Sequence, residues 1–155
     1  MNQARLPQFP CMCSSLRRAV RGLTQLYEEA LRPEGLRATQ FTLLQVLAQA
    51  GEVLQGRLGE MLVMDSTSLT RTLAIMVRQG WIAERKGKDR RERWLRLSDA
   101  GAAQLARALP AWERVQARLR EQLGETAWNG LFETTWHLAG VANDQSSKPA
   151  GERNS

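Results

Sequence analysis

Residues 53–80 carry the pattern that most constrains the fold, because two short amphipathic segments follow each other with only a tight turn between them. The stretch "VLQGRLGEMLVM" predicts one short helix, and "MDSTSLTRTLAIMVRQG" predicts another that is capped by Asp65 or Ser66 and ends at Gly80. Two such helices are typical of a helix-turn-helix. The side chains expected to point inward are Leu54, Leu58, Met61 and Leu62 in the first helix and Leu69, Leu73, Met76 and Val77 in the second.

The outward face of the second helix is predicted to carry small hydroxyl side chains and one arginine. Small side chains let a helix approach base edges closely, and an arginine can donate two hydrogen bonds to a guanine. The alternative is a solvated helix surface, since Ser and Thr near a helix N-terminus often serve only as caps. The candidate DNA-reading residues of this face are Ser66, Thr67, Ser68, Thr70 and Arg71.

A basic β-hairpin is predicted directly after this helix, with "WIAERK" and "RERWLRLS" as strands and "GKD" in the turn. From Glu84 to Arg96, seven basic residues stand against three acidic ones, an excess of four within a chain whose net charge is +6. A helix-turn-helix followed by a basic hairpin predicts a winged helix, whose hairpin can reach phosphates or a narrow minor groove. The candidate contacts in the hairpin are Arg85, Lys86, Lys88, Arg90 and Arg91.

Further amphipathic helices are predicted on both sides of the winged helix, so the expected fold class is mainly α with a small β-hairpin wing (α+β). The first helix is expected to be capped by Ser14 or Ser15 and the second by Thr39, and Pro110 is expected to kink a long helix that starts after Ser98. The predicted organisation is an N-terminal extension (1–13), one domain (14–142) with its winged helix at about 39–98 and dimerisation helices at about 14–32 and 99–142, and a disordered tail (143–155).

The terminal helices carry more apolar surface than a small DNA-reading core can cover. They form either a large intramolecular core or an interface with a second copy, and a symmetric pair could read two half-sites about 34 Å apart. This reasoning favours a homodimer. The apolar side chains concerned are Leu16, Leu23, Leu109, Trp112, Trp128 and Phe132.

The bulk composition is that of one ordinary globular domain of 155 residues, 43% hydrophobic and 25% charged. No apolar run approaches the roughly 18 residues that cross a bilayer, and the N-terminus lacks the apolar region of a secretion signal, so the expected location is the cytoplasm. A pI near 10.3 favours a polyanionic partner, either nucleic acid or an anionic membrane. The arrangement of the charge favours double-stranded DNA and no membrane.

The segments "FTLLQVL", "STSLTRTLAIMVRQGWIAER" and "KDRRERWLRLSDAG" resemble the multiple-antibiotic-resistance regulator (MarR) family of bacterial transcription factors over about residues 12–142. The resemblance implies a winged-helix homodimer, usually a repressor, that binds palindromic operator DNA and releases it when a small molecule or an oxidant acts. By the family's wing motif, Arg91 contacts the minor groove or a phosphate and Asp89 orients it. Gly59 stands where the family commonly has a small Ala, which should weaken that helix slightly.

Both cysteines of the chain, Cys11 and Cys13, are expected immediately before the first helix, where the helix dipole and nearby arginines would favour a thiolate. The first helix is similar to that of the organic-peroxide-sensing (OhrR) branch of the family, which implies a reactive cysteine at Cys13 supported by Tyr27. Ala38 stands in place of a second supporting tyrosine. Inert structural thiols, or a soft metal or metalloid bound by thiols, remain alternatives.

Two other classes of protein compete with a DNA-binding regulator. An enzyme is disfavoured, because the chain has a single histidine, His137, and no nucleophile-base-acid set, metal-ligand cluster or glycine-rich phosphate loop, and no cofactor is expected. A thiol peroxidase that uses Cys11 and Cys13 is the one enzyme that these residues allow. A winged helix that binds an acidic protein instead of DNA is the second alternative.

Overall fold

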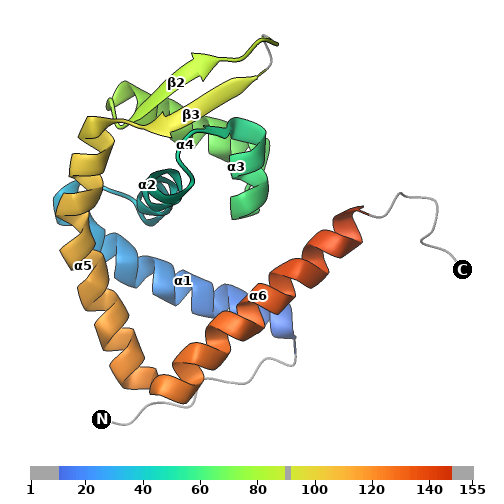
Figure 1. The fold of residues 1–155 in the computed structure, drawn as a ribbon. Coiled ribbons are helices and arrows are strands. Elements are labelled where there is room, and N and C mark those ends of the chain that lie inside the picture. The colour runs from blue at the N-terminus through green and yellow to red at the C-terminus, as the bar shows by residue number, and fades with distance from the viewer. Residues whose placement is uncertain (1–10, 90–91, 148–155) are drawn as a thin grey trace, which may run out of the picture. The chain divides into compact units, whose positions relative to one another are not determined.

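The structure is a computed structural model that describes residues 11–89 and 92–147, with side chains described as far as residue 141. It forms two compact units, Met1–Glu113 and Arg114–Ser155, and helix α5 contributes to both. The elements in chain order are α1 (Met12–Leu31), η1 (Arg32–Glu34), α2 (Ala38–Ala50), β1 (Val53–Leu54), α3 (Gln55–Leu62), α4 (Ser66–Arg78), β2 (Ile82–Lys86), β3 (Arg93–Leu97), α5 (Asp99–Leu123) and α6 (Glu125–Ser147) (Figure 1).

The sheet is antiparallel with strand order β1-β3-β2, so the predicted hairpin is confirmed and gains a third strand. Val53 and Leu54, predicted to begin a helix, pair instead with Leu95 and Trp94 of β3. The prediction was wrong here because the partner strand lies about 40 residues away in the chain and gives no local signal. Leu95 is fully buried, so this face of the sheet packs on the helices.

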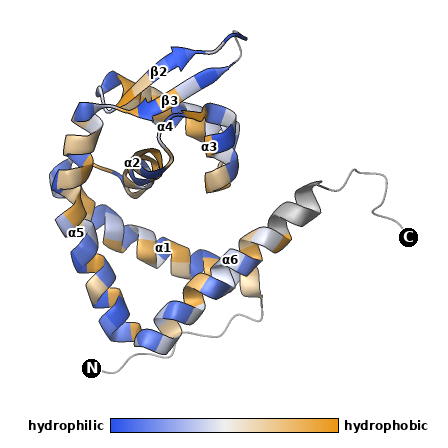
Figure 2. Ribbon diagram, viewed as in Figure 1, coloured by the Kyte–Doolittle hydropathy of each residue, from blue (hydrophilic) through white to orange (hydrophobic). Residues whose placement is uncertain are grey.

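The core of the first unit is built on α2 and closed by α4, the sheet and the first part of α5. All of its largest buried side chains but Gln104 are apolar, and the hydropathy colouring of Figure 2 shows polar residues along the hairpin outside this core. Leu69, Leu73 and Met76 are buried as predicted. Met61, predicted to point inward, is exposed, because α3 meets α4 through Leu58 and Gly59 instead.

Gly59 lies where α3 crosses α4. A Cβ atom at this position would be 3.3 Å from Cδ2 of Leu69, which is closer than ordinary packing allows. The glycine therefore lets the two helices approach each other, at the expected cost in helix propensity.

The first two helices begin earlier than predicted. Helix α1 starts at Met12 with Cys11 as its N-cap residue, which replaces the predicted Ser14 or Ser15. Helix α2 starts at Ala38 rather than after Thr39, because Oε1 of Gln40 accepts a hydrogen bond from the backbone N–H of Arg37 (2.9 Å) and Oε1 of Glu28 accepts one from Ala38 (3.0 Å). Side chains from within α2 and from α1 thus satisfy these amides.

Helix α5 forms after Ser98, as predicted, and runs without a break through Pro110. Its buried positions are small or polar, whereas Leu105, Leu109 and Trp112 are only partly buried against the core. Gln104 is almost fully buried and donates a hydrogen bond from Nε2 to the carbonyl oxygen of Glu34 (2.6 Å), which joins α5 to η1.

Helix α6 extends through Ser147, so residues 143–147 are helical and not part of a disordered tail. The polar side chains of "NDQSS" do not break a helix, and the first strong breaker is Pro149, which disfavours helical backbone at the residue before it. Residues 148–155 of the predicted tail lie outside the described part of the chain. No helix among the described residues is both long and apolar enough to span a membrane.

Candidate nucleic-acid interface

The N-terminal half of α4 presents a polar surface. Asp65 caps the helix, since its Oδ1 accepts a hydrogen bond from the backbone N–H of Ser68 (2.9 Å), and this bond holds the pKa of the carboxyl below its ordinary value. One face of the helix is buried through Leu69, Leu73 and Met76, which turns the other face outward. The predicted DNA-reading residues are all exposed, namely Ser66, Thr67, Ser68, Thr70 and Arg71.

Arg85 lies within β2, as the predicted strand has it, and its side chain is held in place by two partners. Its guanidinium lies over the ring of Trp94, 5.0 Å from the ring centroid, and donates to both carboxylate oxygens of Glu52, with Nε 2.8 Å from Oε1. Trp94 pairs with Arg85 on one side and with Leu54 on the other, so the arginine reaches across β3 to the residue before β1. Hydrogen bonding to Arg85 lowers the pKa of Glu52.

A second ion pair lies on the opposite face of β3, the face that Arg93 shares with Leu95. Nε of Arg93 donates to Oε2 of Glu84 (2.7 Å), and its Nη1 donates to Oε1 of Gln55 (3.2 Å). Nε2 of Gln55 in turn donates to Oγ1 of Thr70 (2.9 Å). A continuous chain of hydrogen bonds therefore runs from the hairpin, through the first residue of α3, to the exposed face of α4.

The base of the hairpin is fastened to α5. Oγ of Ser98 donates to the carbonyl oxygen of Gly80 (2.6 Å) and accepts from the backbone N–H of Gly101 (3.0 Å). A Cβ atom on Gly101 would overlap the carbonyl oxygen of Trp81, so only glycine fits. These contacts give a physical reason for the "LSDAG" sequence, in which the serine caps α5 and the glycine lets it pack against the strand.

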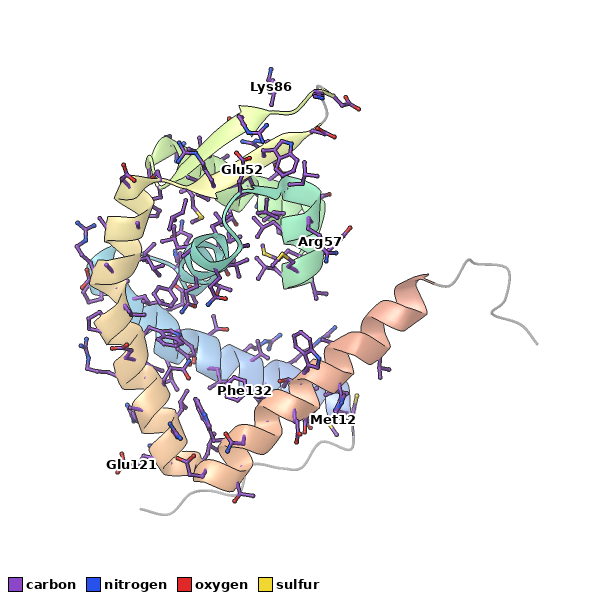
Figure 3. The ribbon with its side chains drawn as sticks, in the orientation of Figure 1. Met12, Glu52, Arg57, Lys86, Glu121 and Phe132 are labelled. Atoms are coloured by element: carbon purple, nitrogen blue, oxygen red, sulfur yellow. The ribbon has the colours of Figure 1, made fainter. Side chains whose placement is uncertain are left out.

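The outer end of the hairpin is only partly described. Lys86 ends β2 and points away from the sheet in Figure 3, and Lys88 and Asp89 are exposed in the turn. The backbone N–H of Glu92 donates to the carbonyl oxygen of Asp89 (3.0 Å). Arg90 and Arg91, two of the predicted contacts, lie outside the described residues.

The thiols lie away from this surface in the sequence and are both exposed at the start of α1. Cys11 is the N-cap residue, whereas Cys13 lies in the first turn and not before the helix as predicted. Hydrogen bonds from the backbone and side chain of Ser14, and from the backbone of Cys13, lower the pKa of the Cys11 thiol. Tyr27 is partly buried against the core, and this burial raises its pKa.

Sequence reasoning did not identify four residues of this region, namely Glu52, Gln55, Arg93 and Trp94. Each acts through a partner that lies 9 to 38 residues away along the chain. Among the described residues, no three side chains of His, Cys, Asp or Glu lie together in a way that could hold a metal ion.

Comparison with known protein families matches residues 34–92 to the model of the MarR family. The chain is also 28% identical over 78 residues to an uncharacterized HTH-type transcriptional regulator, YwoH of Bacillus subtilis (strain 168). That alignment covers 50% of this chain and 57% of YwoH, so the chain spans little more than half the length of this relative.

Solved structures match nearly the whole chain. The transcriptional regulator MosR of M. tuberculosis, crystallised in complex with DNA, is 34% identical with a TM-score of 0.78, and the match covers 86% of this chain and 97% of MosR. A mutant of E. coli MarR complexed with operator DNA is 22% identical with a TM-score of 0.74, covering 82% of this chain and 92% of MarR. The second similarity shows a shared fold.

Proposed function

The chain belongs to the MarR family of winged-helix transcriptional regulators, and from this membership we propose that it binds specific DNA sequences and regulates transcription. The resemblance found in the sequence is thereby confirmed. The relatives are regulators and not enzymes, in agreement with the sequence-based expectation.

One observation carries the proposed DNA binding. The exposed face of α4 offers four hydroxyl side chains and Arg71, and the basic hairpin is joined to this same face through Arg93, Gln55 and Thr70. A helix with small polar side chains fits the major groove, and a basic hairpin fixed beside it supplies contacts to phosphates or to the minor groove. MosR, the relative with 34% identity, was crystallised with DNA, which supports the same role here.

The proposed DNA-binding residues are those predicted from the sequence, with two distinctions. Arg85 is ion-paired with Glu52 in the free chain, so a contact with DNA would require it to share or exchange this partner. Arg90 and Arg91 lie outside the described residues and stay a prediction from the wing motif. The full set is Ser66, Thr67, Ser68, Thr70, Arg71, Arg85, Lys86, Lys88, Asp89, Arg90 and Arg91.

We further propose that the protein acts as a homodimer on a palindromic operator. Helices α1 and α6 each expose large apolar side chains in the single chain, including Val20 and Leu23 in α1 and Phe132 and Trp136 in α6. Exposed apolar surface of this kind marks a protein interface, and two symmetric copies would present two recognition helices to two half-sites. Repression, with release by a small molecule or an oxidant, is the mode of action that the family membership favours.

A binding titration tests the proposal. Duplexes selected by the protein from a random pool, and duplex DNA from upstream of its own gene, are compared with random duplex by fluorescence anisotropy in reducing buffer. A regulator should prefer its selected duplex by at least about a thousandfold. Equal binding of all duplexes would contradict sequence-specific recognition and would favour the alternative of a winged helix that binds an acidic protein.

A thiol-based sensor of the same fold is a second candidate function, favoured by the exposed Cys11 with its lowered pKa. If oxidation of this thiol releases DNA, adding organic peroxide should abolish the preference for the selected duplex and a reductant should restore it. Cys11→Ser and Cys13→Ser separate the roles of the two thiols, because the sequence resemblance assigned the reactive position to Cys13. Unchanged binding of the wild-type protein in peroxide would leave small-molecule effectors as the proposed signal.

A further inference from the structure

The hydrogen bonds that join the hairpin to α4 have a fixed direction. A guanidinium can only donate hydrogen bonds, so the atom of Gln55 that faces Nη1 of Arg93 at 3.2 Å must be the carbonyl oxygen Oε1. The amide nitrogen Nε2 then has to face Thr70, whose Oγ1 lies 2.9 Å away. Arg93 is itself oriented by Glu84 on the neighbouring strand, so the orientation of the Gln55 amide is determined from both ends.

The hydroxyl of Thr70 is constrained by this arrangement. Since Nε2 of Gln55 donates to it, Oγ1 of Thr70 acts as the acceptor in this bond and its own hydrogen points elsewhere. Thr72, two residues further along the same helix, instead donates its hydroxyl hydrogen to the carbonyl oxygen of Ser68 (2.9 Å). Thr70 is exposed, so its hydrogen is available to a molecule that approaches the outward face of α4.

We propose that Gln55 is a positioning residue that presents the hydroxyl of Thr70 as a hydrogen-bond donor to an acceptor atom of the DNA. This inference rests on the proposed DNA binding. The acceptor is either a phosphate oxygen or a base atom such as N7 or O6 of guanine or O4 of thymine. By the same bonds, Gln55 couples the hairpin to the recognition helix, because it contacts both at once.

Replacement of Gln55 by glutamate should reverse the polarity of Thr70. A carboxylate accepts from Arg93 with one oxygen and can only accept from Thr70 with the other, so the threonine hydrogen would turn inward and a lone pair would face the DNA. Replacement by methionine removes both hydrogen bonds, while the side chain keeps nearly the same length. Thr70→Val removes the hydroxyl itself, and Thr70→Ser keeps it.

The experiment uses the full chain and the duplex that the wild-type protein selects from a random pool, together with every single-base-pair substitution of that duplex. Dissociation constants are measured for Gln55→Met, Gln55→Glu, Thr70→Val, Thr70→Ser and the double variant Gln55→Met with Thr70→Val. Gln49→Met and Gln49→Glu are matched controls, because Gln49 is an exposed glutamine near the end of α2. Thermal unfolding verifies that each variant is folded.

Gln55→Met and Thr70→Val should each weaken binding by about two- to tenfold, the effect of one hydrogen bond, and the double variant should bind no more weakly than the weaker single variant. Thr70→Ser should bind like the wild type. If the acceptor is a base, the loss of affinity depends on the identity of one base pair of the duplex. At that base pair, Gln55→Glu shifts the preference toward a base that offers a hydrogen-bond donor. If the acceptor is a phosphate, the losses are uniform, and Gln55→Glu weakens binding more than Gln49→Glu does.

Independent, multiplying losses in the double variant would overturn the proposal, because Gln55 would then not act through Thr70. Wild-type affinity in Thr70→Val would overturn it as well. If the wild-type protein selects no duplex, the proposed DNA reading is refuted, and the positioning role with it. This outcome is distinguishable from the others, because the selection is made with the wild-type protein before any variant is measured.

Discussion

Helices α4 and α6 are both amphipathic in sequence, yet they differ in how far their apolar side chains are buried. Helix α4 buries Leu69, Leu73 and Met76 in the core of the first unit. In α6 no described side chain is buried, and Trp136 is 80% exposed. A helical apolar period is therefore buried in the core in α4, whereas in α6 it leaves an apolar face exposed to solvent.

The difference shows which part of the chain buries its apolar side chains without a second copy. The first unit closes its own core, to which α1 and α5 contribute Leu31 and Ala108. Its polar side chains are also bonded to one another, as Arg85 is to Glu52 and Arg93 to Gln55. The second unit has the ring contact between Trp128 and Phe132 (5.1 Å) and the ion pair between Arg120 and Glu125, but no buried apolar side chain of its own among the described residues. Exposed apolar residues of this kind mark a protein interface, which agrees with the proposed homodimer.

The largest expected effect comes from adding a methyl group in the packed region. Gly101→Ala places a Cβ atom against the carbonyl oxygen of Trp81 and should lower the free energy of unfolding by about 3 kcal/mol. Gly130→Ala is the matched change in α6, where the new Cβ meets no packed neighbour beyond the adjoining backbone of its own helix, and should raise stability by up to about 1 kcal/mol through helix propensity. Urea denaturation measures both, and equal effects would contradict the contrast between the packed first unit, where Gly101 lies in the first turns of α5, and the exposed helix α6.

The exposed face of α6 is tested by removing its most exposed aromatic residue. Trp136→Ala should weaken dimerisation by about 2 kcal/mol, or roughly thirtyfold, if this face meets a second copy. Glu133→Ala, an exposed polar position on the same helix, should leave it unchanged. Sedimentation over a range of concentrations reports the dissociation constant, and a monomeric wild-type protein at all concentrations would refute the proposed homodimer.

The outward face of α4 is tested through its arginine. Arg71→Ala should cost roughly 1–3 kcal/mol of binding to the selected duplex and relax the preference at one base pair, because an arginine is suited to two hydrogen bonds with a guanine. Arg78→Ala, in the last turn of the same helix, serves as the control. Equal losses of Arg71→Ala on selected and random duplexes would remove its role in base recognition, and such a uniform loss is instead expected for Arg91→Ala.

The smallest effect expected is on the hairpin in acid. The pKa of Glu52 is lowered by Arg85, so the ion pair contributes fully above the ordinary carboxyl pKa of about 4.3 and is lost as the pH falls through the lower pKa of the folded protein. The indole NMR signal of Trp94, under the Arg85 guanidinium, should shift in this acid range. Glu52→Gln should abolish the shift, whereas Glu125→Gln, which breaks the Arg120 pair in the second unit, should preserve it.

Much of the fold could be predicted from local sequence. The apolar period of Leu69, Leu73 and Met76 predicts α4, and of the two predicted caps, Asp65 and Ser66, the structure has Asp65. The alternation of Leu95 and Leu97 with Trp94 and Arg96 located β3. In these segments the burial pattern, the caps and the turns all agree, which is the condition under which sequence patterns are informative.

The remaining features depend on contacts between distant residues. Val53 and Leu54 form a strand only because β3 offers them a partner, and Gln104 is buried only because the carbonyl of Glu34 accepts its hydrogen bond. Gln55 could not be chosen as a site residue, since its two partners, Thr70 and Arg93, lie 15 and 38 residues away. The start of α1 at Met12 also escaped prediction, because its N-cap, Cys11, makes no side-chain capping bond.

The ion pairs of the hairpin have a consequence for the thermodynamics of association. Seven basic residues lie between Arg85 and Arg96, and simple counting would let each displace about one condensed counterion from a duplex. Arg85 and Arg93 already neutralise Glu52 and Glu84 within the chain. While these two pairs hold, Arg85 and Arg93 do not release counterions, so the logarithm of the binding constant should fall less steeply with the logarithm of salt concentration than the count of basic residues suggests.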